Sequence, residues 1–341
     1  MRPASAPELA SPHGGRLREA SRRYGIALDQ WLDLSTGVNP VAWPVPPLPL
    51  SCWQRLPEED DGLEIAAAQY YGSEMLLPVA GSQAALQALP WLRPHGAVGV
   101  VGPSYAEHAA AWLRAGHHVE DVEPDTIDSL LPALDALVLV NPNNPTGERY
   151  PIGQLLAWHR QLAARGGWLV VDEAFIDATP AESLVTHAGM RGLIVLRSLG
   201  KFFGLAGARV GFVFADAALR GRLAHLLGPW VVSGPARAVA MLALGDHTWQ
   251  ATQRQRLPQQ AEALRALLAR HGLPPTGCNA LFQWVRTEHA AEIAHTLAHQ
   301  GVLVRRFDYP ESLRFGLPPD AAGLARLDLA LGRAVAVLSL A

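Results

Sequence analysis

The sequence predicts an α/β protein with a large domain, built on a mostly parallel central sheet, and a smaller α+β domain. The chain has 341 residues, which is enough for roughly two domains of about 150 residues each. Between residues 60 and 225, continuous apolar runs alternate with helical patterns, as they do in parallel sheets that are buried on both faces. After residue 229, long helical patterns alternate with short strand patterns, which indicates the second domain.

Five apolar runs are the expected strands of the large domain. They are residues 97–101, 137–140, 168–171, 193–196 and 210–214. Residues 152–164 carry a helical pattern between two of these runs. Because the carboxyl ends of parallel strands share one edge, where ligands bind, the residues that directly follow these runs are the first candidates for a site.

The domain boundaries are expected at two places. Residues 1–40 would form an N-terminal arm that packs with the small domain, residues 41–228 the large domain, and residues 229–341 the small domain. The proline-rich run 40–49 predicts an extended connection after the arm. The expected elements of the small domain are a helical stretch at 235–271, strands at 280–285, 302–304 and 313–315, a helix at 290–300 and a last helix.

Composition excludes several classes of protein. Apolar residues make up 49% of the chain and charged residues 17%, which does not fit a disordered or fibrous protein. A net charge of −3 gives no bulk attraction to nucleic acid or to an anionic membrane, and no apolar run reaches the ~18 residues of a membrane span. Two cysteines, Cys52 and Cys278, cannot form a disulfide framework, and no targeting segment is visible. A cytoplasmic protein is therefore expected.

Lysine is almost absent from the chain. Of the 28 basic residues, all are arginine except Lys201. Arginine can replace lysine in ion pairs and in phosphate binding, but its guanidinium stays protonated and cannot form an imine. Lys201 is therefore a candidate for imine chemistry.

The neighbourhood of Lys201 supports that chemistry. Three motifs follow successive strands: Asn141–Gly147, Asp172–Phe175 and Ser198–Lys201, with Arg209 eight residues after the lysine. In this order the chain resembles the fold-type-I pyridoxal phosphate enzymes of the aminotransferase family, and Lys201 matches the lysine that bonds the cofactor. The resemblance implies the fold of those transferases and pyridoxal 5'-phosphate as the cofactor.

The resemblance also assigns roles to single residues. Lys201 and Asp172 would be catalytic, Asp172 by keeping a proton on the pyridine nitrogen. Tyr105 would stack on the ring, and Asn144 would donate to the ring oxygen. Phe175 stands where many aminotransferases have a tyrosine. The expected cofactor-binding residues are Gly81, Ser82, Gln83, Tyr105, Asn144, Asp172, Phe175, Ser198, Lys201 and Arg209.

The cofactor phosphate would lie between two of these segments. Gly81-Ser82-Gln83 precedes an expected helix at residues 84–89. The backbone amides at the start of this helix would be available to the cofactor phosphate. Ser198 and Arg209 would add a hydroxyl and a forked guanidinium.

A closer resemblance concerns the reaction. Residues 13–20, 32–40 and 227–236 are similar to segments of the threonine-phosphate decarboxylases, with the histidinol-phosphate aminotransferases as the next group. This implies that L-threonine O-3-phosphate is decarboxylated to (R)-1-amino-2-propanol O-2-phosphate and CO2, for the linker of the cobalamin nucleotide loop. The alternative is a histidinol-phosphate-type aminotransferase that transfers the amino group to 2-oxoglutarate. The resemblance also implies a homodimer.

The substrate would be a small phosphorylated amino acid, with two anionic ends to be bound. Arg314 and the Gly37 amide match the groups that hold the α-carboxylate, and Asn144 also matches a substrate-binding position. Arg305 matches the arginine that phosphate-bearing substrates use, and His13 is its expected helper. Arg306 points to the opposite face of the strand and is a weaker candidate. No nucleic acid or membrane partner is expected.

One departure from the family concerns the contact between subunits. A tyrosine-proline pair usually precedes the first helix of the large domain and reaches the cofactor phosphate of the partner subunit. Here the pair is Leu56-Pro57, and Tyr70 or Tyr71 is considered as the substitute.

Rival site types lack residues that they need. Gly200-Lys201 is no nucleotide-binding phosphate loop, because position 195 is valine and position 202 is phenylalanine. Gly102–Ala106 is similar to a nucleophile elbow but lacks its final glycine. His295 and His299 share a helical face at metal-ligand spacing without a third ligand, so no metal is expected.

Overall fold

The computed structural model describes residues 13–338, which form two compact units. The larger unit is Val38–Pro258, and the smaller joins the residues up to Gly37 to those from Gln259 onward. The boundary between the two compact units therefore falls within helix α10 (His247–Arg270). It lies later in the chain than the domain boundary expected at residue 229. The functional division at residues 40 and 228 stays a prediction.

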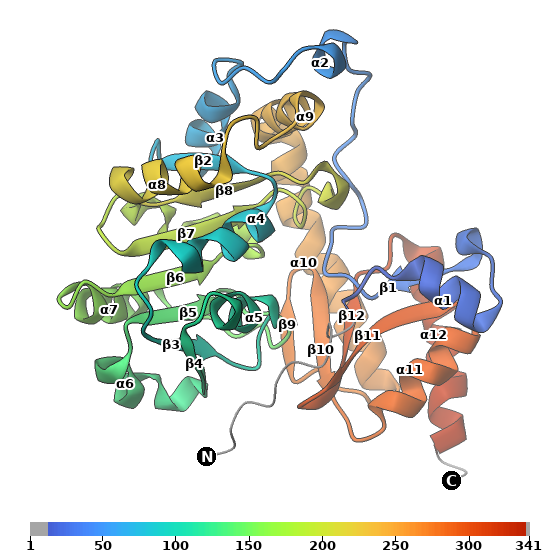
Figure 1. The fold of residues 1–341 in the computed structure, drawn as a ribbon. Coiled ribbons are helices and arrows are strands. Elements are labelled where there is room, and N and C mark those ends of the chain that lie inside the picture. Colours follow the sequence, from blue (N-terminus) through green and yellow to red (C-terminus); the bar gives the residue numbers. More distant parts are fainter. Residues whose placement is uncertain (1–12, 339–341) are drawn as a thin grey trace. The chain divides into compact units, whose positions relative to one another are not determined.

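The larger unit is built on a seven-stranded sheet in the order β2-β8-β7-β6-β5-β3-β4, which Figure 1 shows one below another. The strands are β2 Leu76–Val79, β3 Ala97–Val101, β4 His118–Val122, β5 Ala136–Val140, β6 Trp168–Asp172, β7 Leu193–Ser198 and β8 Gly211–Phe214. The five strands from β7 to β4 are parallel, whereas β8 is antiparallel to both of its neighbours. The predicted mostly parallel sheet is confirmed.

Helices cover this sheet because its strands are apolar on both faces. The helices are α2 Ser51–Gln54, α3 Leu63–Tyr71, α4 Ser82–Ala88, α5 Glu107–Arg114, α6 Ile127–Leu130, α7 Ile152–Ala163, α8 Ala217–Leu227 and α9 Gly234–Gly245, followed by α10. Val98, Val138 and Ile194 share one apolar cluster with residues of α4, α5 and α8. Leu139 and Val171, which alternate with such residues along their strands, are equally buried.

The stretch expected at 235–271 is helical, as predicted, and it is divided into two helices, α9 and α10. Asp246 interrupts it, and its Oδ1 accepts the Trp249 N–H at 3.0 Å at the start of α10. The Gln250 side chain donates to the last carbonyls of α9, those of Ala243 and Leu244, at 3.0 and 2.9 Å. An apolar period continues through such a break, because both helices bury a face in the same unit.

The smaller unit has a five-stranded sheet in the order β1-β11-β12-β10-β9. The strands are β1 Leu32–Leu34, β9 Gly277–Asn279, β10 Phe282–Arg286, β11 Val302–Asp308 and β12 Glu311–Gly316, and the helices are α1 Leu17–Tyr24, α11 Ala290–His299 and α12 Ala321–Leu338. Strand β1 pairs with β11 in parallel, Leu32 opposite Val302. The N-terminal segment is thus part of this sheet. No helix in the described part of the chain is long and apolar enough to cross a membrane.

Candidate active site

The carboxyl edge of the large sheet brings together the three predicted motifs. Strands β5, β6 and β7 are neighbours, with Val140 opposite Asp172 and Asp172 opposite Leu196. Since they are parallel, Asn141, Asp172 and Ser198 emerge side by side at the ends of adjacent strands. The topology therefore delivers polar side chains from all three motifs to one edge.

Asp172 is held in place by two hydrogen bonds. Its side chain is almost fully buried, and its Oδ1 accepts the Ala174 N–H at 3.0 Å. His108, also buried, lies with Nε2 at 3.0 Å from Asp172 Oδ2. A carboxylate can only accept, so Nε2 carries the hydrogen of this bond. Sequence reasoning missed His108, although it stands one helical turn after Tyr105 at the start of α5.

Lys201 follows β7 in a turn that begins at Ser198. The Ser198 hydroxyl accepts the Gly200 N–H at 3.3 Å and so closes this turn. Lys201 Nζ lies 5.8 Å from the centre of the Phe175 ring. The amine is thus directed toward the segment that follows Asp172, and Phe175 lies where its ring contacts the amine but brings no hydroxyl.

The predicted phosphate-binding residues form a cradle at the same edge. Strand β2 ends opposite the start of β8, Val79 opposite Gly211, while Ser198 is opposite Gly211 on the other side. Gly81 has φ +72°, and a Cβ there would lie 2.6 Å from Arg209 Nη2. Only glycine allows this approach.

The donors of the cradle suit a phosphate. A Cβ at Gly211 would collide with the backbone nitrogen of Ser82, so the start of α4 lies directly against β8. Arg209, with φ 55°, is in the left-handed region and turns its guanidinium toward Gly81. A guanidinium, a backbone amide and the Ser198 hydroxyl match the acceptor oxygens of the pyridoxal phosphate ester.

Tyr105 is fixed beside the cradle by Gln83. Its hydroxyl donates to Gln83 Oε1 at 3.1 Å. Burial, with the carboxylates of Glu107 and Asp172, raises the pKa of Tyr105 to about 12, so the phenol stays neutral at physiological pH. Gln83 in turn donates to Glu107 Oε2 at 3.3 Å. The Tyr105 side chain is thereby fixed beside Gln83, and its stacking on the cofactor ring stays a prediction.

Asn144 lies in a loop that its neighbour Asn143 shapes. The Asn143 side chain donates to the carbonyl of Pro103 and to the Thr146 hydroxyl, both at 2.8 Å. This joins the loop to the segment after β3 that carries Tyr105. Asn144 itself is half-buried in the same loop.

The small unit carries the predicted anion-binding arginines on two paired strands. Arg305 of β11 lies directly opposite Arg314 of β12. Burial, then the charge of Arg305, lowers the pKa of Arg314 to about 9. Burial also lowers the pKa of Arg305. The negative charge of Asp308 opposes this shift, and the positive charge of Arg16 adds to it. Like charges directly opposite each other destabilise a sheet, so this pair favours an anionic ligand. Arg306 is exposed and pairs with Asp308 at 2.7 Å.

His13 belongs to a turn that packs on the end of β1. The Gly15 N–H donates to the Ser35 hydroxyl at 2.8 Å, and a Cβ at Gly14 would collide with the Ser35 carbonyl. Arg314 Nη2 donates to that same carbonyl at 2.8 Å. The turn and Arg314 therefore meet at one residue. Arg16, absent from the predicted site, ends this turn, and Gly37 lies two residues beyond Ser35.

Tyr70 and Tyr71, the suggested substitutes for the missing tyrosine, make contacts within their own unit, and their contact with a partner subunit stays a prediction. Tyr70 donates to Asp177 Oδ1 at 2.9 Å, and the Tyr71 ring lies under the Arg197 guanidinium at 4.5 Å. Both side chains thus contact the buried Asp177–Arg197 pair of their own unit, Tyr70 through its hydroxyl and Tyr71 through its ring. Leu56, in contrast, is exposed.

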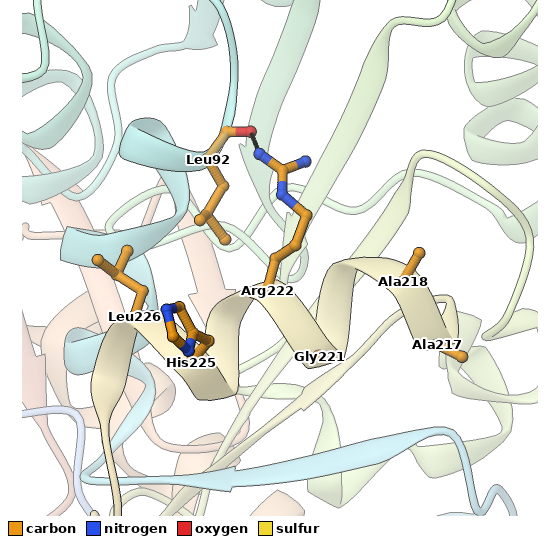
Figure 2. A pocket seen from close by; sticks show the side chains of 7 residues that line it. All are labelled: Leu92, Ala217, Ala218, Gly221, Arg222, His225 and Leu226. Carbon is orange, nitrogen blue, oxygen red and sulfur yellow. Dashed lines mark hydrogen bonds between the residues drawn. The ribbon is translucent and has the colours of Figure 1, made fainter.

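A histidine pair on α11 and a pocket on α8 contain none of the residues predicted to bind the cofactor or the substrate. His295 and His299 have their Nε2 atoms 3.1 Å apart, but within residues 13–338 no group of three or more metal-binding side chains occurs. Figure 2 shows a pocket of about 520 Å³ on α8, where Arg222 reaches the carbonyl of Leu92. Its lining is Leu92, Ala217, Ala218, Gly221, Arg222, His225 and Leu226.

Comparison with known proteins gives one family and several relatives. The family model for aminotransferase class I and II matches residues 57–327. Threonine-phosphate decarboxylase of Pseudomonas aeruginosa is 55% identical over 94% of this chain and 96% of its own, and that of a Sinorhizobium species is 43% identical over 94% and 97%. A solved histidinol-phosphate aminotransferase from Sinorhizobium meliloti, in complex with pyridoxal-5'-phosphate, superposes with TM-score 0.82 over 96% of each chain at 20% identity.

Proposed function

The chain belongs to the aminotransferase class I and II family, and from this premise we propose that it is a pyridoxal phosphate-dependent decarboxylase of L-threonine O-3-phosphate. The products are CO2 and (R)-1-amino-2-propanol O-2-phosphate, which serves as the linker of the cobalamin nucleotide loop. The observation that carries the proposal is the cross-strand pair Arg305–Arg314, since this substrate has two anionic ends.

The large unit supplies the reacting amine and the electrostatics. When bound, pyridoxal phosphate accepts the electron pair that the substrate Cα releases as CO2 leaves. Lys201 Nζ would hold the cofactor covalently and would be the group placed to return a proton to the substrate Cα. Asp172 would pair with the protonated pyridine nitrogen, and the hydrogen bond from His108 orients Asp172. Arg209, Ser198 and the amide of Ser82 hold the cofactor phosphate.

The small unit would orient the substrate. Arg314 forks onto the α-carboxylate together with the Gly37 amide, while Arg305 and His13 bind the phosphate. Holding both ends sets which Cα bond stands perpendicular to the cofactor ring. That orientation decides between loss of CO2 and loss of the α-proton.

The deciding experiment separates decarboxylation from amino transfer. We expect the purified holoenzyme to release CO2 from L-threonine O-3-phosphate without consuming 2-oxoglutarate. Keto-acid turnover without CO2 would instead support the histidinol-phosphate-type aminotransferase. Lys201→Ala is the control, and it should release no CO2 and lack the absorbance of lysine-bonded cofactor. An unchanged absorbance in Lys201→Ala would overturn the assignment of the lysine.

Two further statements belong to this proposal. We place the enzyme in the cytoplasm, where Cys52 and Cys278, both free thiols, stay reduced. We also propose a homodimer as its functional form. Exposed apolar side chains of the large unit, among them Trp53 and Leu56, support the dimer.

A further inference from the structure

The turn that follows Lys201 is held by a segment distant in sequence, residues 39–43. The Asn39 N–H donates to the carbonyl of Lys201 at 2.9 Å, and the Asn39 side chain donates to the carbonyl of Phe202 at 2.9 Å. The Trp43 N–H donates to the carbonyl of Phe203 at 2.8 Å. One short stretch of chain thus donates hydrogen bonds to three successive carbonyls of the turn, those of residues 201–203.

These hydrogen bonds lie in the interior of the large unit. Phe202 and Phe203 are fully buried, and residues 201–204 form a turn rather than a helix or strand. Buried carbonyls outside regular structure need donors from elsewhere, because leaving one unpaired costs about 1–3 kcal/mol. Gly204, with φ +69°, lets Ala42 and the carbonyl of Asn39 approach closely. Within the turn, the Gly204 N–H donates to the Lys201 carbonyl at 3.2 Å, and residues 39–43 supply the remaining hydrogen bonds to the carbonyls of residues 201–203.

The Asn39 amide has only one orientation that satisfies its neighbours. Its Oδ1 accepts the Val41 N–H at 3.0 Å, so Nδ2 faces the carbonyl of Phe202 and Gln253 Oε1, the latter at 3.1 Å. Asn39 and Gln253 are both almost fully buried. Gln253 lies on α10, whose Trp249 stacks on Phe203 with ring centres 5.5 Å apart. Helix α10 thereby orients the Asn39 amide, which in turn holds the turn after Lys201.

We propose that Asn39, oriented by Gln253, is a positioning residue that fixes the main chain of Lys201 and hence the place of its amine. The inference rests on the proposed function, in which Lys201 Nζ bonds pyridoxal phosphate. Asn39 touches neither substrate nor cofactor in this role and acts only through the carbonyls of Lys201 and Phe202. Its side chain must both donate and accept, which an amide does and a carboxylate does not.

The test is the isosteric change Asn39→Asp, measured by reloading the protein with its cofactor. Aspartate keeps the acceptor for Val41 but faces the Phe202 carbonyl and Gln253 Oε1 with an oxygen that cannot donate. When pyridoxal 5'-phosphate is added to the cofactor-depleted chain, we expect the absorbance of lysine-bonded cofactor to form about 10- to 100-fold more slowly. A misplacement of about 1 Å lowers the reaction rate of a reacting group by roughly this factor. In the holoenzyme, kcat should fall while KM for L-threonine O-3-phosphate stays the same.

The matched control is Gln250→Glu, on the same helix. Gln250 is also a buried amide that donates to two main-chain carbonyls, those of Ala243 and Leu244. Gln250→Glu should lower the urea midpoint of unfolding as Asn39→Asp does but load cofactor at the wild-type rate. If Asn39→Asp loads at the wild-type rate, or Gln250→Glu slows equally, the inference is wrong.

A second variant keeps the test usable if Asn39→Asp does not fold. Gln253→Leu retains Asn39 and removes the carboxamide whose oxygen accepts from the Asn39 amide, so we expect a smaller slowing of cofactor loading. A wild-type rate for folded Gln253→Leu counts against the inference. Cofactor loading involves no substrate, so a wild-type enzyme that releases no CO2 would refute the proposed function and leave this result standing.

Discussion

His108 fixes the direction of Asp172, because its Nε2 lies 3.0 Å from Asp172 Oδ2 and both side chains are buried. The second oxygen of Asp172 is bound to the backbone of Ala174, so His108 decides how the carboxylate faces the cofactor ring. Without the hydrogen bond from His108, the carboxylate loses the group that directs it toward a protonated pyridine nitrogen.

His108→Phe is therefore expected to weaken cofactor binding. The loss of a hydrogen bond to a buried charged group costs about 1.5–3 kcal/mol, which corresponds to roughly a 10- to 100-fold higher dissociation constant for pyridoxal 5'-phosphate. Equilibrium titration of the cofactor-depleted protein measures it. His117→Phe is the matched control, since His117 is equally buried but bonds the Pro90 carbonyl at 2.9 Å. A similar loss in His117→Phe would show a general effect on packing.

At the ends of β6 and β7, one residue faces the site and a directly adjacent residue belongs to a buried ion cluster behind it. Asp172 and Ser198 face the site, while Glu173 and Arg197 form an ion pair at 3.4 Å. Arg197 also pairs with Asp177. Because side chains alternate along a strand, the cluster fixes the strand ends without entering the site. Burial raises the pKa of Glu173 to about 6.

This cluster predicts a pH dependence of stability. A carboxyl whose pKa is raised in the folded state from 4.5 to about 6 binds more protons there than in the unfolded state. Its contribution to stability is complete below pH 4.5 and is lost as the pH rises through 6, with a total of about 2 kcal/mol. The difference in unfolding free energy between wild type and Glu173→Gln should change by this amount between pH 4 and 7. Glu182→Gln, at an exposed pair with Arg149, should show no such change.

Elements with a continuous apolar pattern could be predicted from the sequence, and elements without one could not. Residues 97–101 form β3 as expected, since a central strand buries both faces. Strand β4, at the edge of the sheet, is half polar, and β2 contains Pro78, so neither stands out as a run. At the site, the motif residues follow strand ends and can be recognised there. Asn39 and His108 act through contacts that join remote parts of the chain, which no local pattern reports.

At the scale of the whole molecule, the large unit exposes several large apolar side chains to solvent. Trp53 of α2 is 67% exposed, Leu56 is 64% exposed, and Trp230 precedes α9 at 58%. Helix α2 packs on the start of α9, because a Cβ at Gly234 would collide with the carbonyl of Cys52. These side chains therefore come from neighbouring segments. Large exposed apolar patches are a mark of interaction surfaces, and the homodimer that we propose would cover this one with a second copy of the chain.

The dimer predicts a specific response to charge. Trp53→Asp would desolvate a carboxylate at the proposed interface, so we expect light scattering to give the monomer mass of 36.6 kDa for this variant and twice that mass for the wild type. Trp91→Asp is the matched control, because Trp91 is 62% exposed on another part of the large unit. It should remain a dimer. A wild-type chain that scatters as a monomer at micromolar concentration would refute the proposal, whereas dissociation by Trp91→Asp alone would move the interface to that side of the unit.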